Sequence, residues 1–199
     1  SIALSISSPQ EGHAHWGPGD ELTYRIKVEN REASALTGLQ LLLSATSGLG
    51  YQVAGGAGCD SCPAGGQTWA LSIPYLAAKG SHVVTVSGQL AGDLASLEAV
   101  TTTAIIPVTN LGFAQYSHRV DGRPPSVTIN VPQGNGIKAG AGVAVSGTAL
   151  DGNGSGVSQV EVRPAGGSWQ PAKGRGFWTA QVNVPSTQSH YSLEVRATD

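Results

Sequence analysis

The only two cysteines of the chain, Cys59 and Cys62, are separated by two residues within a glycine-rich stretch, residues 55–66. Such a pair can form a redox centre, half of a metal site or a local disulfide. A redox pair needs a helix N-terminus that lowers the thiol pKa, and a zinc site needs two further ligands. The sequence offers neither, so we expect a disulfide that closes a surface loop in an oxidising compartment.

Two histidines, His13 and His15, form a second candidate for chemistry. In an extended segment, alternate side chains lie on the same side, so the two imidazoles would be placed to bind one metal ion as two of its ligands. Glu11 or Asp20 would supply a third ligand. A complete ligand set is not visible, and we expect two solvated histidines that bind no metal.

Asp151 and Asn153 alternate with glycines in a third candidate, whose side-chain oxygens suit calcium. The segment lacks the twelve-residue loop and closing glutamate of an EF-hand. A turn in which Asp and Asn bond their own backbone explains the same residues. We therefore expect no cofactor, with calcium at this turn as the alternative.

Aromatic and basic side chains gather near the C-terminal end, where Trp169, Arg175 and Phe177 would form a contact surface for carbohydrate or protein. Trp178 begins an alternating apolar series that continues through Ala180, and alternation places such a series on the inner face of a strand. We expect Trp178 in the core and Trp169 at a more exposed edge.

Motifs that would indicate catalysis are missing. No serine lies in a G-x-S-x-G nucleophile elbow, and no acidic pair has a setting that would raise one pKa for glycoside hydrolysis. We predict that the chain is not an enzyme. The net charge of -2 likewise gives no indication of a nucleic-acid partner, and no apolar run is long enough for membrane insertion.

The elements that must position these residues are strands. Only 12% of residues are charged, whereas the chain contains 28 Gly and 11 Pro, a composition typical of short strands and tight turns. Leu22, Tyr24, Ile26 and Val28 alternate with polar residues, which describes a strand with one buried face. The spacing of such stretches predicts an all-β chain of two consecutive immunoglobulin-like antiparallel sandwiches, the first with seven strands.

Two stretches of the sequence resemble known families of surface modules. The first resembles the conserved-repeat domain of long bacterial and archaeal surface proteins, through the run Pro18-Gly19-Asp20-Glu21-Leu22-Thr23-Tyr24 followed by Ile26, Val28 and Asn30. The second resembles bacterial immunoglobulin-like or fibronectin type III-like modules, through Ser146-Gly147-Thr148-Ala149, Val160-Glu161-Val162 and Tyr191-x-Leu193-Glu194-Val195. These resemblances imply tandem sandwiches from secreted or surface-anchored proteins.

We expect a first domain at residues 1–118, a Pro-rich linker at 119–125 and a second domain at 126–199. The expected function is that of a non-catalytic spacer or interaction segment of a larger extracellular protein, with other domains of the parent chain as partners. The alternatives are a carbohydrate- or protein-binding module and an accessory region of a secreted hydrolase.

The last expectation concerns the C-terminal strand. The second module should have a final strand beyond Asp199, and the segment from Tyr191 to Ala197 reads as its next-to-last strand. We therefore expect an open edge from Ser189 to Ala197 that pairs with another strand, either from another chain or from elsewhere in this one.

Overall fold

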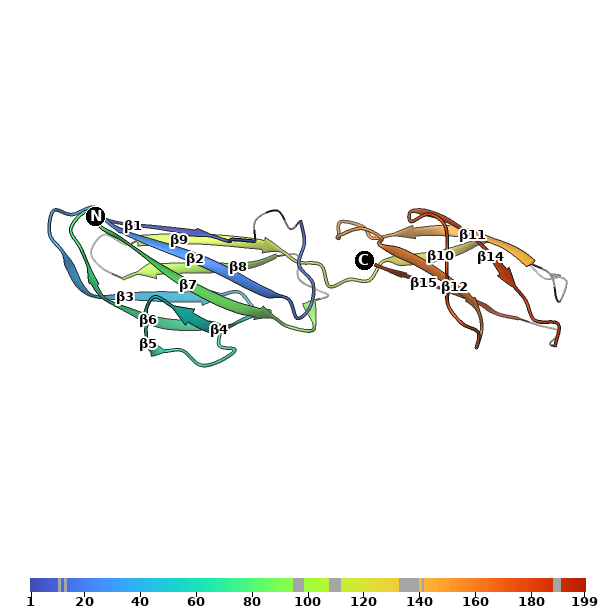
Figure 1. Cartoon of the computed structure of the whole chain (residues 1–199), viewed down its shortest axis with the longest axis horizontal. Helices are drawn as coiled ribbons and strands as arrows, with labels where there is room; N and C mark the ends of the chain where they lie inside the picture. Colours follow the sequence, from blue (N-terminus) through green and yellow to red (C-terminus); the bar gives the residue numbers. More distant parts are fainter. Residues whose placement is uncertain are drawn as a thin grey trace. The chain divides into compact units, whose positions relative to one another are not determined.

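The computed structural model describes residues 1–10, 12, 14–94, 99–107, 112–132, 140, 142–187 and 191–199 (Figure 1). Its regular elements are all β-strands, and the pairings within its sheets are antiparallel. The chain divides into two compact units, Ser1–Gly122 and Arg123–Asp199. The fold class is all-β with immunoglobulin-like sandwiches, as the alternation of apolar and polar residues predicts.

Unit 1, residues Ser1–Gly122, is a sandwich of a four-stranded and a five-stranded sheet. The order in the first sheet is β1-β2-β7-β4, and its strands are β1 (Ile2–Ser7), β2 (Glu21–Asn30), β7 (Ser81–Leu90) and β4 (Leu49–Gly55). The order in the second is β5-β6-β3-β8-β9, and its strands are β5 (Gly58–Ser61), β6 (Thr68–Leu76), β3 (Leu36–Ala45), β8 (Ala99–Ile106) and β9 (Gly112–Arg119).

The core of unit 1 follows the period-2 alternation of its strands. Leu22, Tyr24, Ile26 and Val28 of β2 are all fully buried, whereas Lys27 on the opposite face is exposed. Strands β2, β3, β6 and β7 each place one row of apolar side chains between the sheets, and the buried residues form a single cluster. The alternation in the sequence therefore identified the inner face of β2 correctly.

The described part of unit 1 contains nine strands, where the sequence predicts seven. Part of the excess lies in residues 55–66, which we expected to be a loop: Gly58–Ser61 forms β5, which pairs with β6. All four of its residues are exposed. An edge strand of this kind is held by backbone hydrogen bonds and needs no apolar residues, so hydrophobic periodicity cannot reveal it.

Asn30, the last residue of the resemblance motif, joins the end of β2 to two neighbouring turns. Its buried amide Nδ2 donates to the carbonyl oxygens of Ser34 at 2.8 Å and Ala77 at 2.9 Å, and its Oδ1 accepts from the backbone N–H of Glu32 at 2.9 Å. These bonds satisfy a buried amide and fix the turn after β2. The role of Asn30 is thus structural.

Unit 2, residues Arg123–Asp199, packs two three-stranded sheets together. The first has the order β10-β11-β14, with β10 (Ser126–Val131), β11 (Gly142–Leu150) and β14 (Phe177–Asn183). The second has the order β13-β12-β15, with β13 (Gln170–Pro171), β12 (Gln159–Pro164) and β15 (Leu193–Thr198). The pairing partner of β15 within the described residues is β12 alone.

Trp178 fills the centre of unit 2 and is fully buried, which confirms the face assigned from the sequence. The residues around it are small: Val143, Val145, Ala149, Val160, Val162, Val182 and Val184. Gly147 lies directly against Trp178, since a Cβ added there would stand 2.6 Å from the indole and 1.8 Å from the carbonyl oxygen of Thr128. The missing side chain of Gly147 therefore makes room for both the indole and β10.

Candidate functional site

One sheet of unit 1 has an apolar row on its outer face. Ala70 of β6, Leu42 of β3, Ile105 of β8 and Phe113 of β9 lie directly opposite one another across four neighbouring strands. Leu42, Ile105 and Ala70 are half-buried, whereas Phe113 is 55% exposed. Facing residues on adjacent strands lie close enough to touch, so the four side chains form a continuous apolar stripe.

A parallel row of small polar residues runs beside this stripe. Its members, again opposite one another across β6, β3, β8 and β9, are Thr68, Ser44, Thr103 and Gln115. The Nε2 of Gln115 donates to the hydroxyl of Thr103 at 3.0 Å. Neither row contains a charged residue. We call the two rows together the uncharged face.

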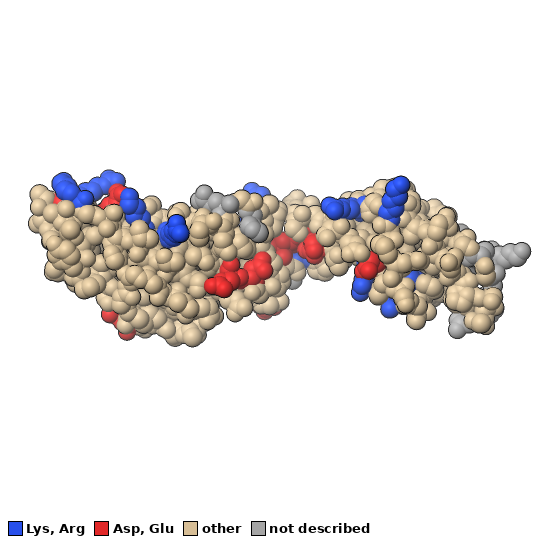
Figure 2. Space-filling view, in the orientation of Figure 1, with Lys and Arg blue, Asp and Glu red and all other residues tan. Residues whose placement is uncertain are grey.

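The other sheet of unit 1 has an outer face of different character. On β2 the outward positions include Glu21, Arg25, Lys27 and Glu29. Lys27 forms an ion pair with Glu29, and the hydrogen bond and charge of this lysine lower the pKa of the Glu29 carboxyl. A view of one side of the molecule shows how sparse charged side chains are (Figure 2). Four charged residues of unit 1 lie on β2, whereas the described strands of the other sheet carry only Asp60 on β5 and Arg119 on β9.

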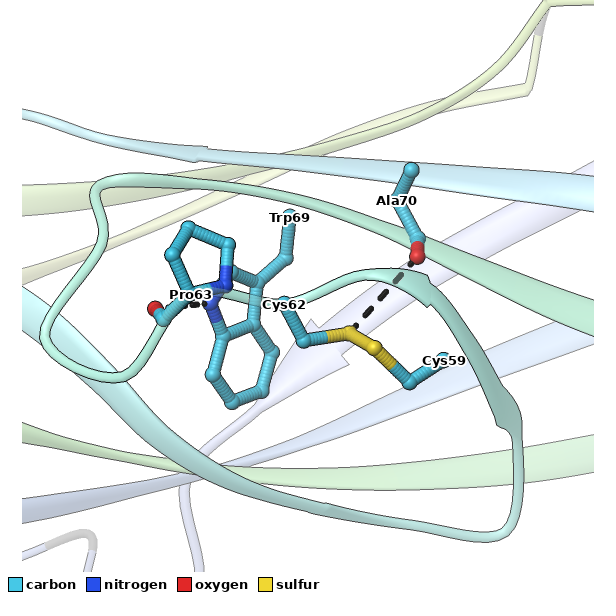
Figure 3. Close-up of a disulfide and its surroundings, with 5 residues drawn as sticks. All are labelled: Cys59, Cys62, Pro63, Trp69 and Ala70. Atoms are coloured by element: carbon cyan, nitrogen blue, oxygen red, sulfur yellow. Dashed lines mark hydrogen bonds between the residues drawn. A yellow bond between two sulfur atoms is a disulfide. The ribbon is translucent and has the colours of Figure 1, made fainter.

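The disulfide between Cys59 and Cys62 closes the loop at the edge of the five-stranded sheet (Figure 3). The loop is anchored to β6, because the indole Nε1 of Trp69, a residue of that strand, donates to the carbonyl oxygen of Pro63 at 2.9 Å. The Sγ of Cys62 also lies 3.7 Å from the carbonyl oxygen of Ala70. A disulfide sulfur has no proton to donate, so this is a packing contact. Both sulfurs are committed to a covalent bond that stabilises the loop.

Trp169 lies in a cluster of charged residues on the outer face of the β13-β12-β15 sheet. The guanidinium carbons of Arg163 and Arg196 lie 4.3 and 4.4 Å from the centroid of its indole ring. Arg163 donates to Glu194 at 2.6 Å, and Arg196 donates to Glu161 at 2.7 Å. Both guanidinium groups are thus held between a carboxylate and the indole, where cation–π attraction adds to the ion pairs.

The three residues that the sequence grouped as a contact surface lie on or beside strands of both sheets of unit 2. Trp169 precedes β13, whereas Phe177 begins β14 in the other sheet of unit 2 and is 66% exposed. Arg175 is exposed in the turn before β14. The arginines over the indole are instead Arg163 and Arg196, which the register of β12 and β15 brings there.

The calcium candidate forms a turn that uses its own backbone. The side-chain Oδ2 of Asp151 accepts the N–H of Gly156 at 2.5 Å, and its carbonyl oxygen accepts the N–H of Gly154 at 2.9 Å. Asn153 is exposed at the tip. Binding of calcium here remains a proposal of the sequence, and the backbone bonds provide the simpler explanation for the aspartate.

The histidine candidate lies partly outside the described residues, since neither His13 nor Glu11 is among them. His15 is half-buried. Asp20, the other suggested ligand, accepts the backbone N–H of Gly17 at 2.8 Å and so closes the turn before β2.

Sequence reasoning missed a buried imidazole in unit 1. His118 is 6% exposed, and its ring lies 4.9 Å from that of Tyr116, 5.2 Å from Tyr24 and 5.6 Å from Trp16, between ring centroids. Neither ring nitrogen has a hydrogen-bond partner among the described residues. Burial lowers the pKa of His118 and raises that of Tyr24 to about 12. Burial therefore favours the neutral form of both groups.

Comparisons with known proteins found likenesses of structure only. No family model matches the sequence, and no curated protein matches it. The CARDB domain of a Pyrococcus furiosus protein, solved in complex with di-metal ions, matches with 12% identity and a TM-score of 0.38, over 62% of this chain and 94% of that one. A non-cellulosomal cohesin from Archaeoglobus fulgidus matches with 12% identity and a TM-score of 0.37, over 61% and 91%.

A transglutaminase from red sea bream matches 99% of this chain but only 27% of its own, with 12% identity and a TM-score of 0.40. At these scores no likeness supports an argument about activity, ligand or partner. Within the described residues, no helix is both long and apolar enough to cross a membrane.

Proposed function

We propose that this chain is a non-catalytic interaction segment of a larger extracellular protein and that it binds a protein partner through the uncharged face. The observation that carries the proposal is the stripe of Ala70, Leu42, Ile105 and Phe113, which runs across four strands on the outside of a folded sandwich. An outer sheet face that meets only water normally carries charged residues, as β2 does.

The composition of the uncharged face suits a protein surface. Depletion of charge and enrichment in aromatic residues characterise the cores of protein interfaces, and Phe113, at the β9 end of the stripe, is 55% exposed and open to contact. The polar row offers the hydroxyl groups of Ser44, Thr68 and Thr103 for hydrogen bonds at the rim of the proposed interface. The disulfide of Cys59 and Cys62 supports an extracellular location.

A carbohydrate-binding role is less well supported. Sugar rings stack on an open aromatic face, whereas the indole of Trp169 is already contacted by Arg163 and Arg196. A protein partner on the uncharged face is therefore the better proposal, and the accessory region of a hydrolase would be one setting for it.

The test is affinity capture from the secreted and cell-surface proteins of the source organism, followed by titration of the purified partner. Phe113→Glu places a charge in the stripe, while Val83→Glu, at a residue of β7 that is 47% exposed, places the same charge on the other sheet. We expect Phe113→Glu to weaken binding at least about tenfold and Val83→Glu to leave it unchanged. Equal loss in both variants, or a partner insensitive to both, would overturn the proposal.

A further inference from the structure

Among the described residues of unit 2, the strand β15 pairs on one side only. Its partner is β12, in the register Glu161↔Arg196, Val162↔Val195 and Arg163↔Glu194. Ala165 donates its N–H to the carbonyl oxygen of Ser192 at 2.8 Å, which extends the same register by one hydrogen-bonded pair. In an antiparallel ladder such pairs recur at every second residue. The backbone groups of Ser192, Glu194 and Arg196 therefore point to β12.

The intervening residues of β15 direct their backbone groups the other way. By the same alternation, the N–H and C=O groups of Leu193, Val195 and Ala197 point to the open edge. Their side chains lie on the inner face and are only partly buried against the core of unit 2. The edge thus combines unpaired backbone groups with incompletely covered apolar side chains, which is what an added strand requires.

We propose that β15 binds β15 of a second copy of this chain, antiparallel and centred on Val195. In that register Val195 faces Val195 of the second copy, and Leu193 faces Ala197. Each of these residues directs its backbone groups to the edge, so all of them form hydrogen bonds across the new junction. The inner faces of both strands then lie on the same side and extend one continuous sheet.

Charge complementarity decides in favour of a second copy and of this register. Centred on Val195, the pairing places Glu194 opposite Arg196 of the second copy, and Arg196 opposite Glu194. A centre on Glu194 would set the two Glu194 carboxylates against each other, and a centre on Arg196 would oppose two guanidinium groups. Like charges directly opposite are destabilising, whereas opposite charges stabilise a strand pair.

The alternation of acidic and basic side chains continues on β12, the neighbour of β15 in the sheet. Glu161 of β12 pairs with Arg196, and Arg163 pairs with Glu194. In the proposed dimer each row across the four central strands would read acid, base, acid, base. This self-complementary order follows from four residues of one chain and would be fortuitous for an unrelated strand.

The register is tested by cross-linking between different variants. Ser192 and Thr198 are both exposed and would lie opposite each other across the junction. An equimolar mixture of Ser192→Cys and Thr198→Cys chains should form a disulfide-linked dimer under mild oxidation, whereas either variant alone should not. Cross-linking in the separate samples at the level of the mixture would overturn the register.

The role of charge is tested by sedimentation of variants that keep opposite charges on β12 and β15 within one chain, although the swaps at Arg163 and Arg196 remove their contacts with Trp169. The double swap Glu161→Arg with Arg196→Glu keeps an ion pair between β12 and β15 but opposes two carboxylates across the junction. We expect it to weaken dimerisation at least about tenfold. Adding Arg163→Glu and Glu194→Arg restores opposite charges everywhere and should restore the dimer.

Thermal unfolding of each variant shows whether unit 2 stays folded, and Val195→Pro provides an independent test. Proline removes an N–H that points to the open edge and spares the pairing with β12, so it should abolish the dimer in a folded chain. Three results would overturn the proposal: a monomer at every concentration, a dimer indifferent to the swaps, or an edge occupied by a strand of another protein or of a longer form of this chain.

Discussion

The two units fill their hydrophobic cores with different side chains. In unit 1 the largest fully buried residues are many and come from both sheets, among them Tyr24, Tyr51, Leu41 and Ile73. In unit 2 the corresponding residue is Trp178, surrounded by valines and alanines. Unit 1 therefore distributes its apolar contacts over many side chains, whereas unit 2 depends on one.

This difference follows from the sheets that each unit has. In the described part of the chain, four strands packed on five cover many large residues from both sides in unit 1, whereas three strands on three in unit 2 leave little interior beyond a single indole. The half-buried state of Leu193, Val195 and Ala197 shows the same shortage at the edge of unit 2. A small sandwich with one central aromatic residue is thus expected to be the less stable of the two.

Replacing that aromatic residue should produce the largest effect. Trp178→Ala removes the side chain that fills the core of unit 2, and we expect unit 2 to lose about 3–5 kcal/mol of unfolding free energy. Its neighbour Phe177 is 66% exposed and serves as the matched control, since Phe177→Ala should cost less than about 1 kcal/mol. Denaturant unfolding monitored by tryptophan fluorescence measures both.

The same experiment examines whether the units are independent. If they are, Trp178→Ala should leave the transition of unit 1 in place, and residues 1–122, which include the buried Val120, should unfold cooperatively when expressed alone. A loss below about 1 kcal/mol for Trp178→Ala would contradict the dominance of the indole. A shift of both transitions together would contradict independence.

Sequence patterns were sufficient to predict burial where the position of a residue within its own strand decides whether its side chain faces the core. The burial of Tyr24 and Ile26, and that of Trp178, follow from alternation, because a side-chain period of two assigns a whole strand to one face. The pairing of β15 with β12 alone among the described residues agrees with the expected open edge, whereas Ser189, where that edge was expected to begin, lies outside the described residues.

Contacts between side chains of strands that lie far apart in the sequence could not be predicted from alternation within one strand. The stripe of Leu42, Ile105 and Phe113 exists only through the registers of β3, β8 and β9. The contacts of Trp169 with Arg163 and Arg196 need the pairing of β12 with β15. One signal was available: Glu and Arg alternate in both Glu161–Arg163 and Glu194–Arg196, which suggests paired outer faces.

Breaking the disulfide should have a smaller effect, confined to unit 1. The ring between Cys59 and Cys62 is short, so the chain entropy that it removes corresponds to about 2 kcal/mol or less. Cys59→Ser with Cys62→Ser should therefore lower the unfolding free energy of unit 1 only slightly and increase amide exchange near β5. Free-thiol labelling of the unreduced, denatured wild-type chain is the accompanying measurement, and two reactive thiols would refute the bond.

The smallest expected effect is a loss of stability of unit 1 at acidic pH, and His118 gives unit 2 no such dependence. Burial among Trp16, Tyr24 and Tyr116 lowers the pKa of His118 in the folded state below the ordinary 6.5. Between the two pKa values the unfolded chain binds a proton that the folded chain does not, so unit 1 loses stability as the pH falls below about 6.5. One proton limits the slope to about 1.4 kcal/mol per pH unit.

Above that pH the imidazole is neutral in both states and contributes no pH dependence. His118→Phe keeps a ring in the site and removes the titration, so the unfolding free energy of unit 1 should depend less on pH between 5.5 and 6.5 than in the wild type. Unit 2 should be indifferent to the replacement. Denaturant unfolding at a series of pH values measures this, and an unchanged slope in His118→Phe would show that His118 gains a proton as easily in the folded chain as in the unfolded one.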